Sequence, residues 1–281
     1  MERSGPAVHA SSGLERHAEH HHNWVWIYTA SRIHGSNTIQ MSVPNFVVLD
    51  SVHGRFIVNR HCDFQADTLI KTGATHIENE LQNIFAIIDT LPRGSVIIDG
   101  GANAGFFTIP VANRVQGRGH KIISFEPQQM LYRALSGSLA LNDIDFCDLY
   151  YAGLGESPGV AIVPPIDYGK PQDFGMVQIS QQGNGTPVDI MTIDGFDLDR
   201  LDFIKLDVEG YECAALLGGA QTIQKHRPYI WVEFFITGID PIKQVLHAVP
   251  DYAFFKVDYQ NMLCMPREKL GTISFSGIDE C

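Results

Sequence analysis

The sequence predicts a Rossmann-like α/β fold, in which a mostly parallel sheet is flanked by helices. Three observations predict it: short apolar strands alternate with segments of helical periodicity, a glycine-rich loop follows the first strand of this series, and an acidic residue ends the next strand. Units of this strand–helix–strand kind connect parallel strands by right-handed crossovers. We therefore expect ligands to bind at the carboxyl ends of the strands.

The charge of the chain argues against nucleic acid as a partner. The chain has 281 residues and a net charge of −12, and it contains no basic run. Phosphate backbones are bound by clustered lysines and arginines, which are missing here. The length suits one α/β domain with an elaboration, or two small domains.

The cysteines and the apolar segments indicate the compartment. The five cysteines are scattered and form no C-x-x-C pair, which predicts free thiols. No apolar run approaches the roughly 20 residues that span a bilayer. The first residues lack the apolar core of a signal peptide. We therefore expect a soluble, cytoplasmic protein without membrane association.

The N-terminal part is predicted to form a cap. Residues 1–22 are polar and rich in histidine, so we expect a disordered tail. Residues 23–90 predict an N-terminal β-element and one helix that cap the main domain. The strands are expected at 24–30, 45–50 and 54–59, and the helix at 77–90.

Residues 91–281 carry the alternating pattern of the main domain. Strands are expected at 95–99, 121–125, 147–151, 202–207 and 229–235, followed by a hairpin of 253–258 and 261–266. Helices are expected at 106–113, 128–141, 211–218 and 220–225. The stretch 164–185 is too rich in Gly, Pro and Gln for a plain helix. The stretch contains Tyr168 and Phe174, which are expected either to form a lid over a substrate site or to belong to an ordinary connecting loop.

The loop that runs from Asp99 to Phe106 follows a strand and opens a helix. Its glycines let a ligand approach the backbone, and the helix start offers free N–H groups. The dinucleotide pattern G-x-G-x-x-G is incomplete, because Ala102 stands at its middle position. Asp99 would repel a pyrophosphate but would suit an ammonium group. S-adenosylmethionine carries an ammonium group and a sulfonium and has no phosphate, so the loop favours this cofactor.

A second acidic residue supports the same ligand. Glu126, in the segment Phe125-Glu126-Pro127, ends the strand after the glycine loop. A carboxylate at this place can accept hydrogen bonds from both hydroxyls of a ribose. The alternative, a surface charge at a strand end, loses weight because the glycine loop lies upstream at the expected distance.

Four segments together resemble the FkbM family of S-adenosylmethionine-dependent methyltransferases. They are IIDGGANAGFFT, ISFEP, LNDI and DFIKLDVEGYE, and the likeness extends from about Asn79 to Pro266. The resemblance implies a class I methyltransferase fold, with a mostly parallel seven-stranded sheet whose last strand is antiparallel. It also implies S-adenosylmethionine as the donor and a hydroxyl on a sugar or a natural product as the usual acceptor.

The resemblance also implies the roles of individual residues. Asp99, Gly101, Asn103 and Gly105 would line the methionine end, Glu126 would hold the ribose, and residues 151–154 would lie near the adenine. Many methyltransferases have an Asp after the third strand that binds the adenine amino group, but this chain has Ala-Gly-Leu there. Backbone groups, Asn142 or Asp143 would have to bind the amino group instead. Family members carry an acid near Glu78 and Glu80 that can reach the methionine. The predicted cofactor-binding set is Glu78, Asp99, Gly100, Gly101, Asn103, Gly105, Phe106, Glu126, Pro127, Asn142, Ala152, Gly153 and Asp207.

The segment 205–210 supplies the candidate catalytic groups. Strand alternation places Lys205 and Asp207 on one side of their strand, Glu209 follows the strand, and Glu233 ends the neighbouring one. Three carboxylates can thus converge at the sheet edge. One can act as a general base with a raised pKa, or a pair can hold a divalent cation; no metal is assigned. In a purely structural alternative, Asp207 caps the next helix and Lys205 neutralises it.

The leading hypothesis is therefore O-methylation of a small-molecule acceptor by a monomer or homodimer, without nucleic acid or membrane as partners. A nicotinamide-dependent oxidoreductase is an alternative, against which the incomplete glycine pattern and the missing Tyr-x-x-x-Lys pair argue. A non-catalytic cofactor-binding protein is a second alternative, against which the carboxylates of the 202–209 segment argue.

Overall fold

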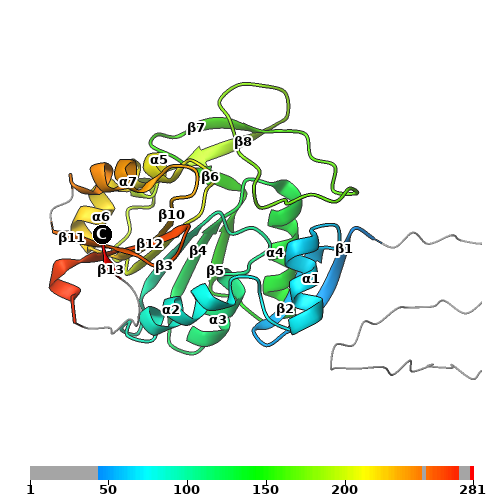
Figure 1. Cartoon of the computed structure of the whole chain (residues 1–281), viewed down its shortest axis with the longest axis horizontal. Helices are drawn as coiled ribbons and strands as arrows, with labels where there is room; N and C mark the ends of the chain where they lie inside the picture. The colour runs from blue at the N-terminus through cyan, green and yellow to red at the C-terminus, as the bar shows by residue number, and fades with distance from the viewer. Residues whose placement is uncertain (1–43, 249–250, 272–278) are drawn as a thin grey trace, which may run out of the picture.

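An eight-stranded sheet forms the centre of the molecule in the computed structural model, which describes residues 44–248, 251–271 and 279–281 (Figure 1). Its order is β13-β11-β12-β10-β9-β3-β4-β5. The strands are β3 (Val96–Gly100), β4 (Lys121–Phe125), β5 (Cys147–Tyr150), β9 (Phe203–Leu206), β10 (Tyr229–Glu233), β11 (Tyr252–Lys256), β12 (Asn261–Pro266) and β13 (Asp279–Glu280). The run from β5 to β10 is parallel, whereas β12 is antiparallel to both of its neighbours. Apart from the two-residue β13, this is the predicted seven-stranded sheet with an antiparallel last strand.

Helices cover both faces of the sheet. One face carries α2 (Glu78–Ile88), α3 (Thr108–Val115) and α4 (Gln129–Leu141), and the other carries α5 (Glu212–Leu217), α6 (Ala220–His226) and α7 (Ile239–Leu246). Neighbouring residues of one strand serve different cores, because side chains alternate between the two faces of a sheet. Ile97 and Phe203 belong to the first core, and Ile98 and Ile204 to the second. The central strands are therefore apolar over most of their length, as buried parallel strands are, and Asp99 and Lys205 are exceptions near the carboxyl edge.

The described N-terminal part is a hairpin followed by a helix. β1 (Phe46–Ser51) and β2 (Gly54–Asn59) pair antiparallel, and α1 (Asp63–Thr72) follows. The hairpin packs on the main domain, where the backbone N–H of Ile57 donates to Ser138 Oγ at 2.8 Å and the ring of Phe56 stacks on Phe106. The predicted tail at 1–22 and the predicted strand at 24–30 lie outside the described residues.

The predicted elements are present in the described residues with ends shifted by at most two residues, but several further elements were not predicted. α1 lacks a clear apolar stripe, because Phe64 and Ile70 are exposed while Leu69 is buried. α7 was also missed. A second small sheet has the order β6-β8-β7, built from β6 (Ala152–Leu154), β7 (Gly159–Val163) and β8 (Thr186–Met191). The stretch 164–185 connects β7 to β8.

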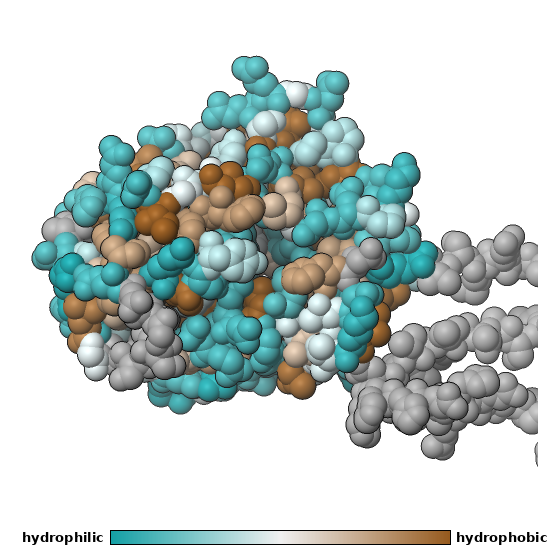
Figure 2. Space-filling model, in the orientation of Figure 1, coloured by the Kyte–Doolittle hydropathy of each residue, from teal (hydrophilic) through white to brown (hydrophobic). Residues whose placement is uncertain are grey.

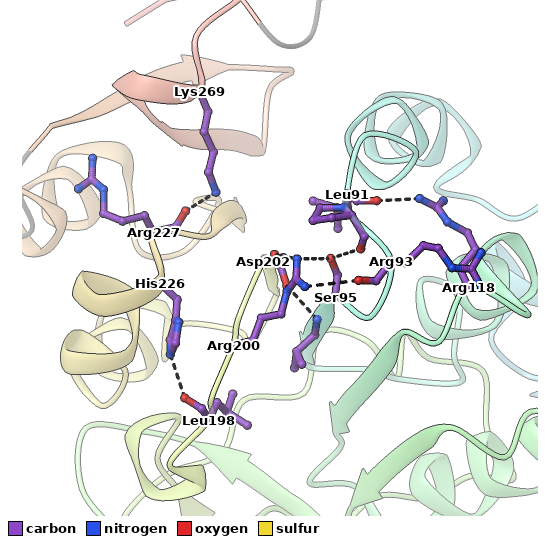
Figure 3. A network of polar contacts seen from close by, with 12 residues as sticks. Leu91, Arg93, Ser95, Arg118, Leu198, Arg200, Asp202, His226, Arg227 and Lys269 are labelled. Carbon is purple, nitrogen blue, oxygen red and sulfur yellow. Dashed lines mark hydrogen bonds and ion pairs between the residues drawn. The ribbon is translucent and has the colours of Figure 1, made fainter.

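A polar network fastens the two central strands at their amino ends (Figure 3). The guanidinium of Arg200 donates to both carboxylate oxygens of Asp202, at 2.6 and 2.9 Å, and to Ser95 Oγ at 3.2 Å. Asp202 Oδ2 in turn accepts from the backbone N–H of Val96 at 3.0 Å. Nearby, Lys269 donates to the carbonyl oxygen of Arg227. The network fixes the register of β3 and β9 at the end opposite to their carboxyl edge.

Two predictions about the whole chain can be compared with the structure. None of the five cysteines forms a disulfide bond, as predicted, and Cys62 and Cys264 among them are buried. Among the described helices, none combines the length and the apolar character that crossing a bilayer requires.

Candidate active site

A cavity of about 660 Å³ opens at the carboxyl ends of the central strands. The strand ends supply Gly101, Glu126, Asp207 and Glu233 to its lining. Its other walls come from α1 and the segment after it, from β6, from the stretch 164–185 and from the turn between β11 and β12. The cavity lies where parallel α/β sheets bind their ligands.

The glycine loop forms one wall of the cavity. Gly101 has a φ of +75°, and a Cβ at this position would lie 1.8 Å from the carbonyl oxygen of Asp207. Only glycine fits, because a side chain would overlap the backbone of the next strand. Asn103 also has a positive φ, of 52°, and its backbone N–H donates to Glu126 at 2.7 Å. The loop therefore holds its backbone close to both β4 and β9.

Glu126 is buried in the cavity wall, with 3% of its surface exposed. Its Oε2 accepts from the backbone N–H of Asn103 and its Oε1 from that of Gln128, each at 2.7 Å. Burial raises the pKa of Glu126 to about 7, although both hydrogen bonds work in the opposite direction. A carboxylate has about four acceptor sites, so Glu126 retains acceptor capacity for a ligand.

Lys205 connects two of the predicted carboxylates beneath the cavity. Its ammonium lies 3.2 Å from Asp207 Oδ2 and 3.6 Å from Asp99 Oδ1, and it donates to the carbonyl oxygen of Gly101 at 3.2 Å. Asp99 is fully buried, accepts from Thr108 Oγ1 at 2.5 Å, and has its pKa raised by burial. Lys205 and Asp207 thus lie on the same side of their strand, as predicted, whereas Asp99 lies behind the cavity lining.

Three carboxylates converge at the base of the cavity, and we call them the carboxylate floor: Asp207, Glu209 and Glu233. One oxygen of each lies within 4.8 Å of the others. Burial and the neighbouring charge of Asp207 raise the pKa of Glu209 to about 8. Burial also raises the pKa of Glu233 to about 9, assisted by Asp207 and Glu209 and by a hydrogen bond shared with Asp207. Among the described residues, Glu209 Oε2 has no hydrogen-bond partner.

The two acids at the start of α2 occupy different surroundings. Glu80 lines the cavity, hydrogen-bonds Asn261, and has its pKa raised to about 7 by burial. Glu78 turns away, because its carboxylate pairs with His53 Nε2 at 2.7 Å and accepts from Gln82. The structure therefore places Glu80 in the cavity lining and Glu78, which was predicted for the cofactor site, outside that lining.

The other predicted residues divide in the same way. Pro127, Ala152 and Gly153 line the cavity beside Glu126. Asn142 does not line it, because its side chain binds the backbone of Arg55 and Ser138 and thereby fastens β2 to the end of α4. Three loop residues lie behind the lining and support its shape by packing: Gly100, Gly105 and Phe106.

Several lining residues were not predicted. His76 lines the cavity, and burial lowers its pKa to about 4. The stretch 164–185 contributes Asp173, and the turn between β11 and β12 contributes Asp258. Loop residues of this kind carry no periodic signal, so only the tertiary structure places them. Among the described lining residues, seven are Asp or Glu and none is Lys or Arg.

Residues 99–257 of this chain match the Methyltransferase FkbM domain. The match covers more than half of the sequence and contains the glycine loop, Glu126 and the carboxylate floor. The chain belongs to the FkbM methyltransferase family. The predicted family and the predicted class I fold are thus confirmed, and an oxidoreductase is set aside.

Relatives of this FkbM chain are distant. Methyltransferase sdnD of Sordaria araneosa is 27% identical over 164 residues, which cover 47% of this chain and 62% of that protein. The structure of an FkbM methyltransferase from Methylobacillus flagellatus KT is 18% identical, with a TM-score of 0.45 over 72% of this chain and 55% of that one. An rRNA methylase from Streptococcus thermophilus is 12% identical, with a TM-score of 0.40 over 66% and 92%. The chain thus spans less than two thirds of the first two proteins.

Proposed function

We propose that this chain binds S-adenosylmethionine in the cavity and transfers its methyl group to a hydroxyl of a sugar or a small natural product. The observation that carries the proposal is the meeting of the glycine loop, Glu126 and the carboxylate floor in one cavity of about 660 Å³. Family membership supports the reaction class.

The charges of the cavity fit a cationic cofactor. Its described lining contains seven Asp and Glu residues and no Lys or Arg, so a bound cation would favour ionised acids around it. S-adenosylmethionine carries a sulfonium and an ammonium, whereas the pyrophosphate of a dinucleotide would be repelled. The same charges and the net charge of −12 disfavour a polyanionic acceptor such as RNA.

The described residues offer a place for each part of this cofactor. Glu126 would accept hydrogen bonds from the ribose hydroxyls, and Ala152 and Gly153 would lie beside the adenine. Gly101 and Asn103 would face the methionine end, where Glu80 replaces Glu78 as the acid for the ammonium group. Lys205 would hold the carboxylate of Asp207 in position through their ion pair.

The carboxylate floor supplies the base. When bound, S-adenosylmethionine supplies an electrophilic methyl group for an in-line displacement. A neutral hydroxyl is a poor nucleophile, so a nearby base must take its proton. We assign this role to Glu209, because its Oε2 has no hydrogen-bond partner among the described residues, whereas Asp207 pairs with Lys205 and Glu233 shares a hydrogen bond with Asp207.

Calorimetry tests cofactor binding. We expect S-adenosylmethionine and S-adenosylhomocysteine to bind the full chain, and NAD not to bind. Glu126→Gln should weaken binding roughly 10- to 100-fold, because a neutral amide accepts weaker hydrogen bonds than a carboxylate. Glu156→Gln, at an exposed turn position, is the matched control. A folded protein that gives no heat with either ligand would refute the proposal.

Transfer is measured with S-adenosylmethionine labelled in its methyl group and a panel of small hydroxyl-bearing acceptors. Glu209→Gln should bind S-adenosylhomocysteine normally and transfer label roughly 100- to 10,000-fold more slowly, as expected for loss of a general base. Transfer at the rate of the unmodified chain would exclude Glu209 as the base.

A further inference from the structure

Large apolar side chains are exposed where the cavity opens, and we call them the apolar rim: Phe64, Met176, Phe235 and Tyr259. All four line the cavity, yet they are 62%, 47%, 59% and 74% exposed. Figure 2 shows that hydrophobic side chains gather among hydrophilic ones on the visible face. Single exposed apolar residues are common on proteins, but a group around one cavity marks a binding surface.

The rim is held in place by its supports. The ring of Phe64 meets the ring of His76 edge to face, with centroids 5.3 Å apart. Asp258 Oδ1 accepts from the backbone N–H groups of Gln260 and Asn261, at 2.8 and 2.7 Å, which fixes the turn that carries Tyr259. The backbone N–H of Phe234 donates to the carbonyl oxygen of Gln260 at 2.7 Å and so joins the segment of Phe235 to this turn.

Met176 is fixed by a buried anchor two residues before it. Phe174 is 0% exposed, stacks on Tyr168, and its carbonyl oxygen accepts from Gln128 Nε2 at 2.7 Å. Phe174 is therefore an anchor of the stretch 164–185 rather than part of a lid. A surface that is already ordered loses little entropy on binding, so the rim can contribute affinity for an apolar group.

The cavity thus combines an acidic interior with an apolar opening. We propose that the methyl acceptor is a non-anionic amphipathic molecule, whose hydroxyl-bearing end enters toward the carboxylate floor while an apolar chain or ring lies on Phe64, Met176, Phe235 and Tyr259. This inference rests on the proposed function, since it assumes that an acceptor occupies the cavity next to the cofactor. It assigns substrate selection to the four rim residues.

Alkyl glucosides of increasing chain length are the probes. Their affinity for the full chain saturated with S-adenosylhomocysteine is measured with methyl, hexyl and octyl β-glucoside below micelle-forming concentrations. Each methylene that reaches the rim should increase affinity roughly twofold to fourfold. Octanoate should bind roughly tenfold or more weakly than octyl glucoside, because the described lining offers its carboxylate no Lys or Arg.

Variants separate the rim from a general effect of apolar surface. The double variant Phe235→Ser/Tyr259→Ser should bind S-adenosylhomocysteine normally and lose most of the dependence on chain length. Val52→Ser is the matched control, because Val52 is 73% exposed in the β1–β2 turn and does not line the cavity.

Three outcomes would overturn the inference. Equal affinity for methyl and octyl glucoside would exclude an apolar contact. A loss of chain-length dependence in Val52→Ser equal to that in the double variant would exclude the rim as its cause. The third outcome is a membrane surface: the unmodified chain binds phosphatidylcholine vesicles, the double variant does not, and the glucoside affinities of the unmodified chain do not depend on chain length. Binding of S-adenosylhomocysteine is measured first, so a failure of the proposed function is recognised separately.

Discussion

At the scale of single residues, Lys205 joins the strand of the glycine loop to the strand of the carboxylate floor. Its ammonium lies between Asp99 of β3 and Asp207 of β9. The pKa of Lys205 is raised, because the two carboxylates outweigh the burial that works to lower it. Removing one partner from a buried ion pair leaves the other charge buried and unpaired. The loss in the free energy of unfolding then exceeds the stability that the pair itself contributed.

Lys205→Met should therefore destabilise the fold by about 3–5 kcal/mol, because it leaves the buried Asp99 unpaired. The measurement is urea unfolding of the purified chain at neutral pH. Lys121→Met is the control, since Lys121 pairs with Asp148 at 2.8 Å on the surface and should contribute less than about 1 kcal/mol. Equal losses in the two variants would show that Lys205 has no special role.

At the scale of elements, the glycine loop gives the sharpest expectation. Gly101 and Gly117 have nearly the same φ, +75° and +74°, but a Cβ on Gly117 meets nothing within 4 Å. Gly117→Ala should lower the free energy of unfolding by about 1–2 kcal/mol, because an L-residue is strained in a left-handed backbone conformation. Gly101→Ala adds an overlap with the Asp207 carbonyl, so we expect about 3 kcal/mol or more and a loss of binding to S-adenosylhomocysteine.

Urea unfolding and calorimetry on both variants check this expectation. Similar stabilities and similar affinities in the two variants would mean that the loop can move away from β9. The comparison keeps the backbone strain constant and varies only the contact.

The same elements show what the sequence could predict. Gly101, Glu126, Asp207 and Glu233 were predicted to share a site, because strand ends are read from local pattern and parallel strands share an edge. Glu78 was predicted for the cofactor site, but its carboxylate pairs with His53 of a distant hairpin and Glu80 lines the cavity instead, which local pattern does not reveal. Asp173, Asp258 and Tyr259 lie in loops, and α1 exposes apolar residues on its outer side. Neither feature has a periodicity from which its position can be inferred.

At the scale of the whole molecule, the buried acids predict how stability depends on pH. The pKa values of Glu80, Glu126, Glu209 and Glu233 are raised to about 7, 7, 8 and 9. A carboxyl with a raised pKa keeps a proton in the folded state that the unfolded chain has released. Its stabilising contribution is full below about pH 4.5 and is lost as the pH rises through the folded value.

His76 has the opposite effect on stability, because its pKa is lowered to about 4 in the folded state. Its contribution to stability is therefore lost as the pH falls below about 6.5. Above pH 6.5 the acids dominate, so the stability of the ligand-free chain should fall as the pH rises from 6.5 to 8.5. Denaturant unfolding at several pH values measures this slope. The variant Glu209→Gln/Glu233→Gln should flatten it, and an unchanged slope would contradict the assignment.

The position of β12 between β10 and β11 has a consequence for synthesis of the chain. β11 leaves the ribosome before β12, yet the place beside β10 belongs to β12. The edge of β10 therefore stays open until residue 266 has been made, and an open strand edge can pair with other chains. Asp258, Tyr259 and Asn261 complete the cavity only when this last hairpin docks. A ligand of the cavity can accordingly capture chains in which this hairpin has docked, and its supply during synthesis would protect them from aggregation.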